Sequence, residues 1–201
     1  MTKFLEKLEP HTKGLIFISF TACLWSSSGL FIKVLQLDAF QISFYRSGIA
    51  AVTILIISYL RKAKPKFEKD LISNLCAISY AAILIFFVLA TKMTTAANAI
   101  FLQFTAPIYL LFLEPIFLKT KFRTRDLVTI IFCVVGMGMF FFGKLEIGGI
   151  YGNMFAILSG ISFALFSLFL KWKKQLHNSN NTINNLIVGN ALVSLICLPF
   201  I

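Results

Sequence analysis

Residues Thr94–Leu118 read TTAANAIFLQFTAPIYLLFLEPIFL, and this stretch decides the class of fold. A helix of about 20 apolar residues crosses the hydrocarbon core of a bilayer, so the stretch is long enough to span. It also contains Asn98, Gln103, Thr105 and Pro107, which a helix that only anchors a protein does not need. Because lipid offers polar groups no partners, these side chains must face protein or water. The stretch therefore predicts a spanning helix that lines a site.

The composition of the whole chain points to the same environment. Of its 201 residues, 58% are hydrophobic and only 13% are charged, whereas a soluble domain carries about 25% charged residues. The net charge of +11 would suit a nucleic-acid-binding protein. The positive residues, however, lie in short clusters between apolar segments, which is typical of membrane topology. We therefore expect an all-α polytopic membrane protein whose partner is the lipid bilayer and not nucleic acid.

About seven transmembrane helices are predicted from segment length and flanking residues. They cover 14–35, 39–60, 71–91, 94–118, 126–143, 150–171 and 182–201. Most of the 19 lysines and arginines lie before the first span or in the second, fourth and sixth connections. By the positive-inside rule these segments are cytoplasmic. The predicted location is the cell (inner) membrane, multi-pass, with a cytoplasmic N-terminus.

Two segments resemble each other at a constant offset. Gly14–Lys33 reads GLIFISFTACLWSSSGLFIK and Gly152–Lys171 reads GNMFAILSGISFALFSLFLK. Five spans separate their starts, so the second copy enters the membrane from the opposite face, as in the inverted repeats of many transporters. We therefore expect a complete five-helix repeat over 14–143 and the first two helices of an inverted second repeat over 150–201. The remaining helices are expected to be lost by truncation or supplied by another chain, including a second copy in a homodimer.

Arg46 is the most distinctive single residue because it lies inside the second predicted span. A central arginine costs on the order of 2.5–3.5 kcal/mol on insertion scales. One interpretation is a contact with an anionic or carboxylate-bearing ligand, supported by Tyr45 and Gln41. The alternative is structural, with the side chain reaching the interface or capping carbonyls of a neighbouring helix.

The first span carries Trp25-Ser26-Ser27-Ser28-Gly29 at mid-depth. Small hydroxyl residues allow close helix packing, and they also suit the lining of a cavity. Tryptophan favours membrane interfaces, so Trp25 near the midplane is less ordinary. Trp25 and Ser27 are therefore candidates for a ligand-binding wall, with plain packing as the alternative.

The polar residues of the fourth span follow helical spacing. Asn98, Thr105 and Tyr109 share one helix face, and Gln103 lies off that face. Pro107 lacks a backbone donor, so it frees the carbonyl of Gln103 and kinks the helix. The combination predicts a substrate site or a hinge; a tolerated kink is the alternative.

Glu114 lies near the predicted cytoplasmic end of the same span. It is a candidate proton or cation site, although contact with interfacial water or with Lys119 and Lys121 also accounts for it. The four cysteines lie apart inside apolar spans and are expected to pack as small hydrophobes. The sequence contains no nucleophile–base pairing, metal-ligand spacing or phosphate loop, so we expect no enzyme activity, metal or cofactor.

The chain resembles the EamA-like branch of the drug/metabolite transporter superfamily. The resemblance is carried by WSSSGLFIK at 25–33, QISFYRS at 41–47, TTAANA at 94–99, LQFTAPIY at 102–109, and Gly136. It implies ten helices in two inverted five-helix repeats, a central cavity for small metabolites, and no ATP hydrolysis.

On this basis we expect a secondary transporter whose small-molecule substrate binds near the midplane. The candidate binding residues are Trp25, Ser27, Arg46, Asn98, Gln103 and Thr105, with Pro107 as hinge or kink. The alternative is a truncated or split membrane protein that does not transport until another chain supplies the missing helices. An intramembrane enzyme is a third and weaker alternative, because no catalytic constellation is present.

Overall fold

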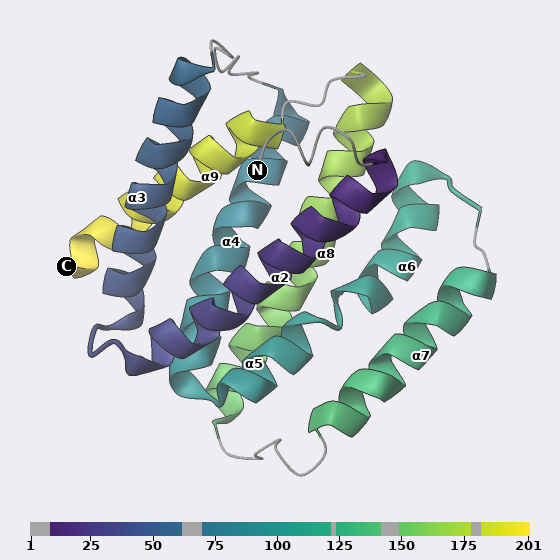
Figure 1. Ribbon diagram of the computed structural model, residues 1–201, viewed down its shortest axis with the longest axis horizontal. Coiled ribbons are helices and arrows are strands. Elements are labelled where there is room, and N and C mark those ends of the chain that lie inside the picture. Colours follow the sequence, from purple (N-terminus) through teal and green to yellow (C-terminus); the bar gives the residue numbers. More distant parts are fainter. Residues whose placement is uncertain (1–8, 62–69, 122–123, 142–148, 178–181) are drawn as a thin grey trace. The chain divides into compact units, whose positions relative to one another are not determined.

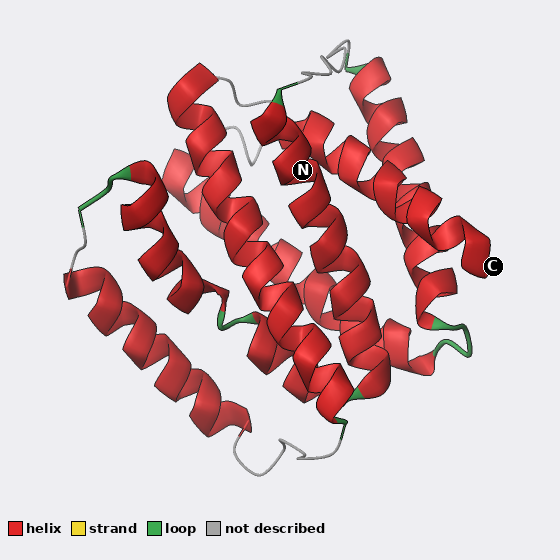
Figure 2. Ribbon diagram, turned by 180° about the vertical axis from the view of Figure 1, so that it is seen from behind, coloured by secondary structure: helices red, strands yellow, loops and turns green. Residues whose placement is uncertain are grey.

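The computed structural model describes residues 9–61, 70–121, 124–141, 149–177 and 182–201. Within these ranges the chain is helical apart from short connections, and no strand occurs (Figure 2). The chain forms two compact units, Met1–Gln36 and Leu37–Ile201, and each unit is described by itself.

The described part of the first unit contains one long helix, α2 (Pro10–Val34). Proline occupies the first turn, where its missing N–H costs no helical hydrogen bond. The helix ends at Leu35, whose backbone is extended and whose N–H donates to the carbonyl of Phe31 at 3.0 Å. Its length and hydropathy suffice to cross a membrane.

The second unit contains the remaining helices. They are α3 (Ala39–Leu60), α4 (Leu71–Met93), α5 (Ala96–Gln103), α6 (Ala106–Leu118), α7 (Thr124–Phe141), α8 (Ile150–His177), α9 (Thr182–Cys197) and the short 3-10 helix η1 (Leu198–Phe200). Side chains cap some of these helices at their starts. Asp70 Oδ2 accepts a hydrogen bond from Ser73 N at 3.1 Å, and the Thr95 hydroxyl accepts one from Asn98 N at 3.1 Å. These bonds satisfy amide groups that the first turn leaves without helical partners.

Six segments of the described chain are long and apolar enough to cross a membrane. They are His11–Val34, Ala39–Leu60, Leu71–Met93, Ala96–Leu118, Ile150–Leu176 and Thr182–Phe200. The predicted polytopic helical membrane fold is thus confirmed. The predicted span 126–143 corresponds to α7, which is not among these six, and its last two residues lie outside the described ranges. The repeats predicted over 14–143 and 150–201 stay a prediction.

Helices α4 and α8 form the centre of the second unit (Figure 1). Helix α9 packs against α3 and α4, while α5 and α6 pack against α8. Helix α7 lies beside α5 and α6 with fewer contacts. The two spans after residue 149 therefore pack onto spans of the preceding sequence.

Small apolar side chains allow these helices to approach closely. Ala90 on α4, Ala99 on α5 and Ala156 on α8 form one fully buried cluster. A second cluster joins Cys76 of α4 to Phe166 of α8. Cys76 packs as a small hydrophobe there, as the sequence predicted for the cysteines.

Successive spans of the second unit run in opposite directions (Figure 1). As a result, the carboxyl ends of α3, α6 and α8 lie at the same end as the amino end of α4. We call this the basic end, because it carries Arg61, Lys119, Lys121, Arg125, Lys171, Lys173 and Lys174. Lys92 lies at the opposite end of α4. This arrangement agrees with the charge segregation read from the sequence.

Large apolar side chains remain exposed on several helices of the second unit. Among the most exposed are Ile49, Tyr59, Leu71, Phe112, Ile116, Phe132, Met139 and Leu195. A soluble protein seldom exposes so many large apolar side chains. Lipid, in contrast, leaves such side chains in an apolar solvent. The exposed surface is therefore the one expected of a membrane protein.

Candidate functional site

The fourth span is broken into two helices. Helix α5 ends at Gln103 and α6 begins at Ala106. In an unbroken helix the carbonyl of Gln103 would accept from residue 107, but Pro107 has no N–H. The backbone turns instead at Thr105, whose N–H and hydroxyl both point to the carbonyl of Leu102, at 3.3 and 2.6 Å. The span predicted over 94–118 thus corresponds to the apolar segment Ala96–Leu118, which is broken just before Pro107.

The sequence reasoning overlooked a second proline in this span. Pro115 lies inside α6. It removes the hydrogen bond to the carbonyl of Leu111 and weakens the last turns of the helix. Helix α6 therefore begins at the break in the span, and its last turns are weakened by Pro115.

Helix α8 packs against the break in the fourth span at Gly160. A Cβ placed on Gly160 would lie 3.0 Å from the carbonyl oxygen of Leu102 and 3.1 Å from that of Gln103. Glycine therefore suits this close approach, because a Cβ here would force α8 or the carbonyls to shift. Beside it, Gln103 Nε2 donates to the Ser159 hydroxyl at 2.9 Å, and Ser159 donates to the carbonyl of Ile83 at 3.3 Å. A polar relay thus joins α5, α8 and α4 next to the break.

Asn98 belongs to a buried cluster at the end of the second unit that is opposite the basic end. Its Nδ2 donates to Thr94 Oγ1 and to Asn153 Oδ1, both at 3.1 Å. Thr94 Oγ1 donates to the same Asn153 oxygen at 2.9 Å. Asn98 is only 3% exposed. The cluster holds the start of α8 against the α4–α5 junction, so the Asn98 amide is engaged by protein.

Close backbone packing accompanies this cluster. A Cβ on Gly152 would lie 2.7 Å from the backbone carbon of Met93 and from the nitrogen of Thr94. Gly149 has a positive φ of 78°, and a Cβ there would lie 2.6 Å from the Met93 carbonyl oxygen. The start of α8 therefore requires glycine at both positions.

Thr105 and Tyr109 share a face of the fourth span, as their spacing predicted. Their hydroxyl oxygens lie 3.3 Å apart, and both side chains are partly buried. The break separates this pair from Asn98, which lies on α5. Gln103 and Thr105 therefore meet at the break, and Asn98 contributes to a different cluster.

Arg46 lies on α3, away from the contacts around the break. Its side chain is exposed and interacts electrostatically with Tyr80 of α4. The expectation that Gln41 supports it is wrong. Gln41 Oε1 instead accepts a hydrogen bond from Asp38 N at 3.2 Å, at the start of α3. Such a contact is half of a capping box and satisfies the amide that precedes the helix.

Trp25 and Ser27 lie on α2, in the first unit. The Ser27 hydroxyl donates to the carbonyl of Leu24 at 2.7 Å, one turn earlier in the same helix. Serine commonly satisfies its hydroxyl in this way inside a membrane helix. The other candidate residues belong to the second unit.

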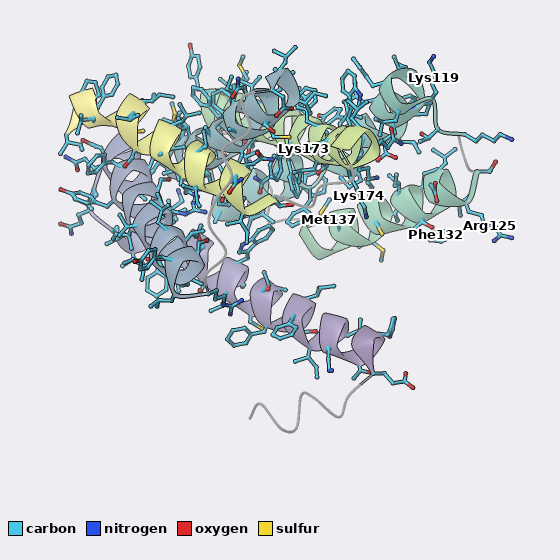
Figure 3. The ribbon with its side chains drawn as sticks, turned by 90° about the horizontal axis from the view of Figure 1, so that it is seen from above. Lys119, Arg125, Phe132, Met137, Lys173 and Lys174 are labelled. Atoms are coloured by element: carbon cyan, nitrogen blue, oxygen red, sulfur yellow. The ribbon has the colours of Figure 1, made fainter. Side chains whose placement is uncertain are left out.

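Two carboxylates at the basic end associate with lysines of α8. Glu114 forms an ion pair with Lys171, where the sequence suggested water, Lys119 or Lys121. Asp70 lies within electrostatic range of Lys173, whose side chain is only 2% exposed. In the view from this end, Lys173 lies among the helices (Figure 3). The sequence does not single out these lysines, because their partners come from distant spans.

The capping carboxylate Asp70 has a shifted pKa. Burial alone would raise the pKa of Asp70, but hydrogen bonds with Ser73 and the charge of Lys173 outweigh it and lower the pKa. A lowered folded-state pKa means that ionised Asp70 stabilises the fold above its unfolded-state pKa. That contribution is lost as the pH falls through the folded-state pKa.

Replacing Asp70 with asparagine should therefore lower stability most at neutral pH. Asparagine still caps the helix, but it gives Lys173 no counter-charge. We expect the free energy of unfolding to fall by about 1 kcal/mol, which lowers Tm by roughly 2–4 °C. This difference from the parent should become smaller as the pH falls. Thermal unfolding at a series of pH values measures it. Asp126→Asn, in the exposed first turn of α7, is the control, and an equal, pH-independent loss at Asp70 would contradict the assignment.

Among the described residues, no group of three or more His, Cys, Asp or Glu side chains could hold a metal ion. The polar groups that converge are amides, hydroxyls and backbone carbonyls around a broken spanning helix. A helix broken at membrane depth is tolerated where it is covered by protein or lines a water-filled cavity, as in transporters. Fold and site together define a polytopic helical membrane protein of the transporter class.

A family model described as the EamA-like transporter family matches residues 12–142. This match covers more than half of the chain, so the protein belongs to the EamA-like transporter family, within the drug/metabolite transporter superfamily. No curated protein and no solved structure gives a significant match. Members of this family are membrane transporters and not enzymes.

Proposed function

We propose that this protein is a secondary transporter of small metabolites that carry a carboxylate, either as anions or as zwitterions. The observation that carries the proposal is the break in the fourth span. Gln103 and Thr105 lie there, partly buried, roughly midway along Ala96–Leu118. Broken helices near the midplane are where transporters of several folds bind their substrates.

The candidate residues take different parts in this proposal. Gln103 and Thr105 present amide and hydroxyl groups for hydrogen bonds to the substrate. Arg46 lies on α3, away from the break, where its positive charge would attract the carboxylate of the substrate. An intramembrane arginine is costly unless it has such a use. Trp25 and Ser27 lie on α2 in the first unit, and their part in binding stays a prediction from the sequence.

Asn98 is proposed as a further binding residue, near the end of the span where a substrate would enter. Its bonds to Thr94 and Asn153 favour a second role, which is to hold α5 and α8 together. Residence in the cell (inner) membrane, a cytoplasmic N-terminus and completion of the second repeat by a homodimer or a partner chain also stay predictions.

Uptake into proteoliposomes tests the proposal. The probe is a mixture of isotope-labelled amino acids and short-chain carboxylic acids, with mass spectrometry of the vesicle contents. We expect at least one compound to accumulate above protein-free vesicles, and Arg46→Ala to reduce its uptake at least about tenfold, the loss of about 1.4 kcal/mol in binding.

Arg61→Ala is the matched control, because Arg61 lies at the basic end of the same helix. It should leave uptake unchanged. Equal uptake by Arg46→Ala and the unmodified chain would remove Arg46 from the site. If no compound accumulates with any variant, the proposed substrate class is wrong.

A further inference from the structure

The ion pair between Glu114 and Lys171 joins two parts of the membrane domain. Glu114 lies on α6, the second half of the broken fourth span, and Lys171 lies on α8. The Glu114 side chain is 21% exposed and that of Lys171 is 54% exposed. The carboxylate is therefore largely covered by protein, while its partner reaches the surroundings. Ionisable residues within spanning segments are costly and commonly mark functional sites.

The depth of the pair gives it access to water. Helix α8 has 28 residues, about 42 Å at about 1.5 Å per residue. The hydrocarbon core is only about 30 Å thick, so the last turns of α8 extend beyond it. Lys171 is six residues before the end of α8, and Glu114 is four residues before the end of α6. The pair thus lies at the edge of the hydrocarbon, where a proton can reach it from the basic end.

The other charged residues of α8 near the ion pair, and the residue that follows α6, are positive. On α8, Lys173 and Lys174 follow Lys171, and Lys119 directly follows the end of α6. At the start of α7, Arg125 and Asp126 are exposed, and Figure 3 shows Lys119 and Arg125 at the outer edge. Asp126 is therefore the other carboxylate on the described helices that pack against α6. Glu114 therefore supplies the negative charge in the attraction between α6 and α8.

Two features make the end of helix α6 able to move when that attraction changes. It is interrupted from α5 at Phe104–Thr105, and Pro115 weakens the turn that carries Glu114. Close to the ion pair, the rings of Phe117 and Trp172 lie 6.2 Å apart. By contrast, α4 and α8 are held along their length by the Asn98 cluster, the Gln103–Ser159 relay and their buried apolar contacts. Losing the Glu114–Lys171 pair would therefore loosen α6 and leave the α4–α8 contact in place.

We propose that Glu114 is a proton-binding site that controls the contact between α6 and α8. The ionised carboxylate holds Lys171 and keeps the two helices together at the basic end. A proton taken up from water neutralises the carboxylate, breaks the ion pair and frees the end of α6, which moves about the break at Phe104–Thr105. This inference rests on the proposed transport function. It adds to that function an opening at the basic end that is controlled by a proton.

Trp172 reports the proposed movement without any substrate. The chain has two tryptophans, Trp25 and Trp172, so Trp25→Phe leaves only the one beside the ion pair. The full chain in phosphatidylcholine nanodiscs is titrated over about pH 3 to 8, the range in which carboxylates titrate. We expect the emission to shift to longer wavelength as the pH falls, because Trp172 loses Phe117 and meets water. Glu114→Gln should abolish the pH dependence.

Two further variants keep the experiment decisive. Lys171→Gln retains the carboxylate but removes its partner, so the emission should stay at the long-wavelength position at every pH. Asp126→Asn should keep the transition of the parent. An unchanged transition in Glu114→Gln, or no pH dependence in the parent, would overturn the proposal. The fluorescence measurement does not depend on transport. If the emission shifts with pH as expected but no compound is taken up, only the proposed substrate class is contradicted.

Discussion

Replacing Gly152 with alanine should lower the thermal stability of the protein markedly. A Cβ at this position would lie 2.7 Å from backbone atoms of Met93 and Thr94. Backbone atoms cannot rotate away as the end of a side chain can, so α8 must shift away from the α4–α5 junction. Overpacking of this kind costs about 1–3 kcal/mol, which is on the order of 5 °C in Tm for a chain of this size.

The control for Gly152 is another glycine in a helix. Gly138 lies on α7, and a Cβ there would meet no atom within 4 Å. Gly138→Ala should leave Tm unchanged or raise it slightly, because alanine favours helices over glycine by up to about 1 kcal/mol. Thermal unfolding of both variants in the same detergent makes the comparison. Equal Tm values for Gly152→Ala and the parent would show that α8 does not approach the α4–α5 junction closely.

The fold was largely predictable because membrane helices are set by length and flanking charge. The span predicted at 39–60 matches α3 at both ends, and α4 differs from its prediction by two residues at one end. Helix α8 continues to His177, past the predicted end at 171. The prediction stopped where apolar residues gave way to lysines, but a helix does not end where the bilayer ends.

The candidate site was only partly predictable from the sequence. Pro107 indicated the kink through its missing donor, and the spacing of Thr105 and Tyr109 placed them on one face. Ser159 and Asn153, however, are partners from a span more than 50 residues further along the chain. Their role depends on which helices pack together, and a single sequence of uniformly apolar spans carries little information on that pairing.

Asn153→Ala is the second substitution from which we expect a large effect. Asn153 Oδ1 accepts hydrogen bonds from both Thr94 and Asn98. Removing it takes the shared acceptor from two buried donors, and each such loss costs about 1–3 kcal/mol. Asn98→Ala removes one of these two donors, and Thr94 still donates to Asn153. We therefore expect Asn153→Ala to destabilise the protein more than Asn98→Ala does.

The double variant separates the structural role of Asn98 from a role in binding substrate. If Asn98 and Asn153 act as one cluster, their effects on unfolding in mixed detergent micelles should be non-additive, by about 0.5–3 kcal/mol. Gln103→Ala combined with Asn153→Ala is the matched control and should be closer to additive, because Gln103 bonds to Ser159 instead. Additive losses at Asn98 and Asn153 would contradict the cluster. A loss of uptake in Asn98→Ala without a loss of stability would support the proposed binding role of Asn98, because losing a contact that only holds helices together is expected to lower stability as well.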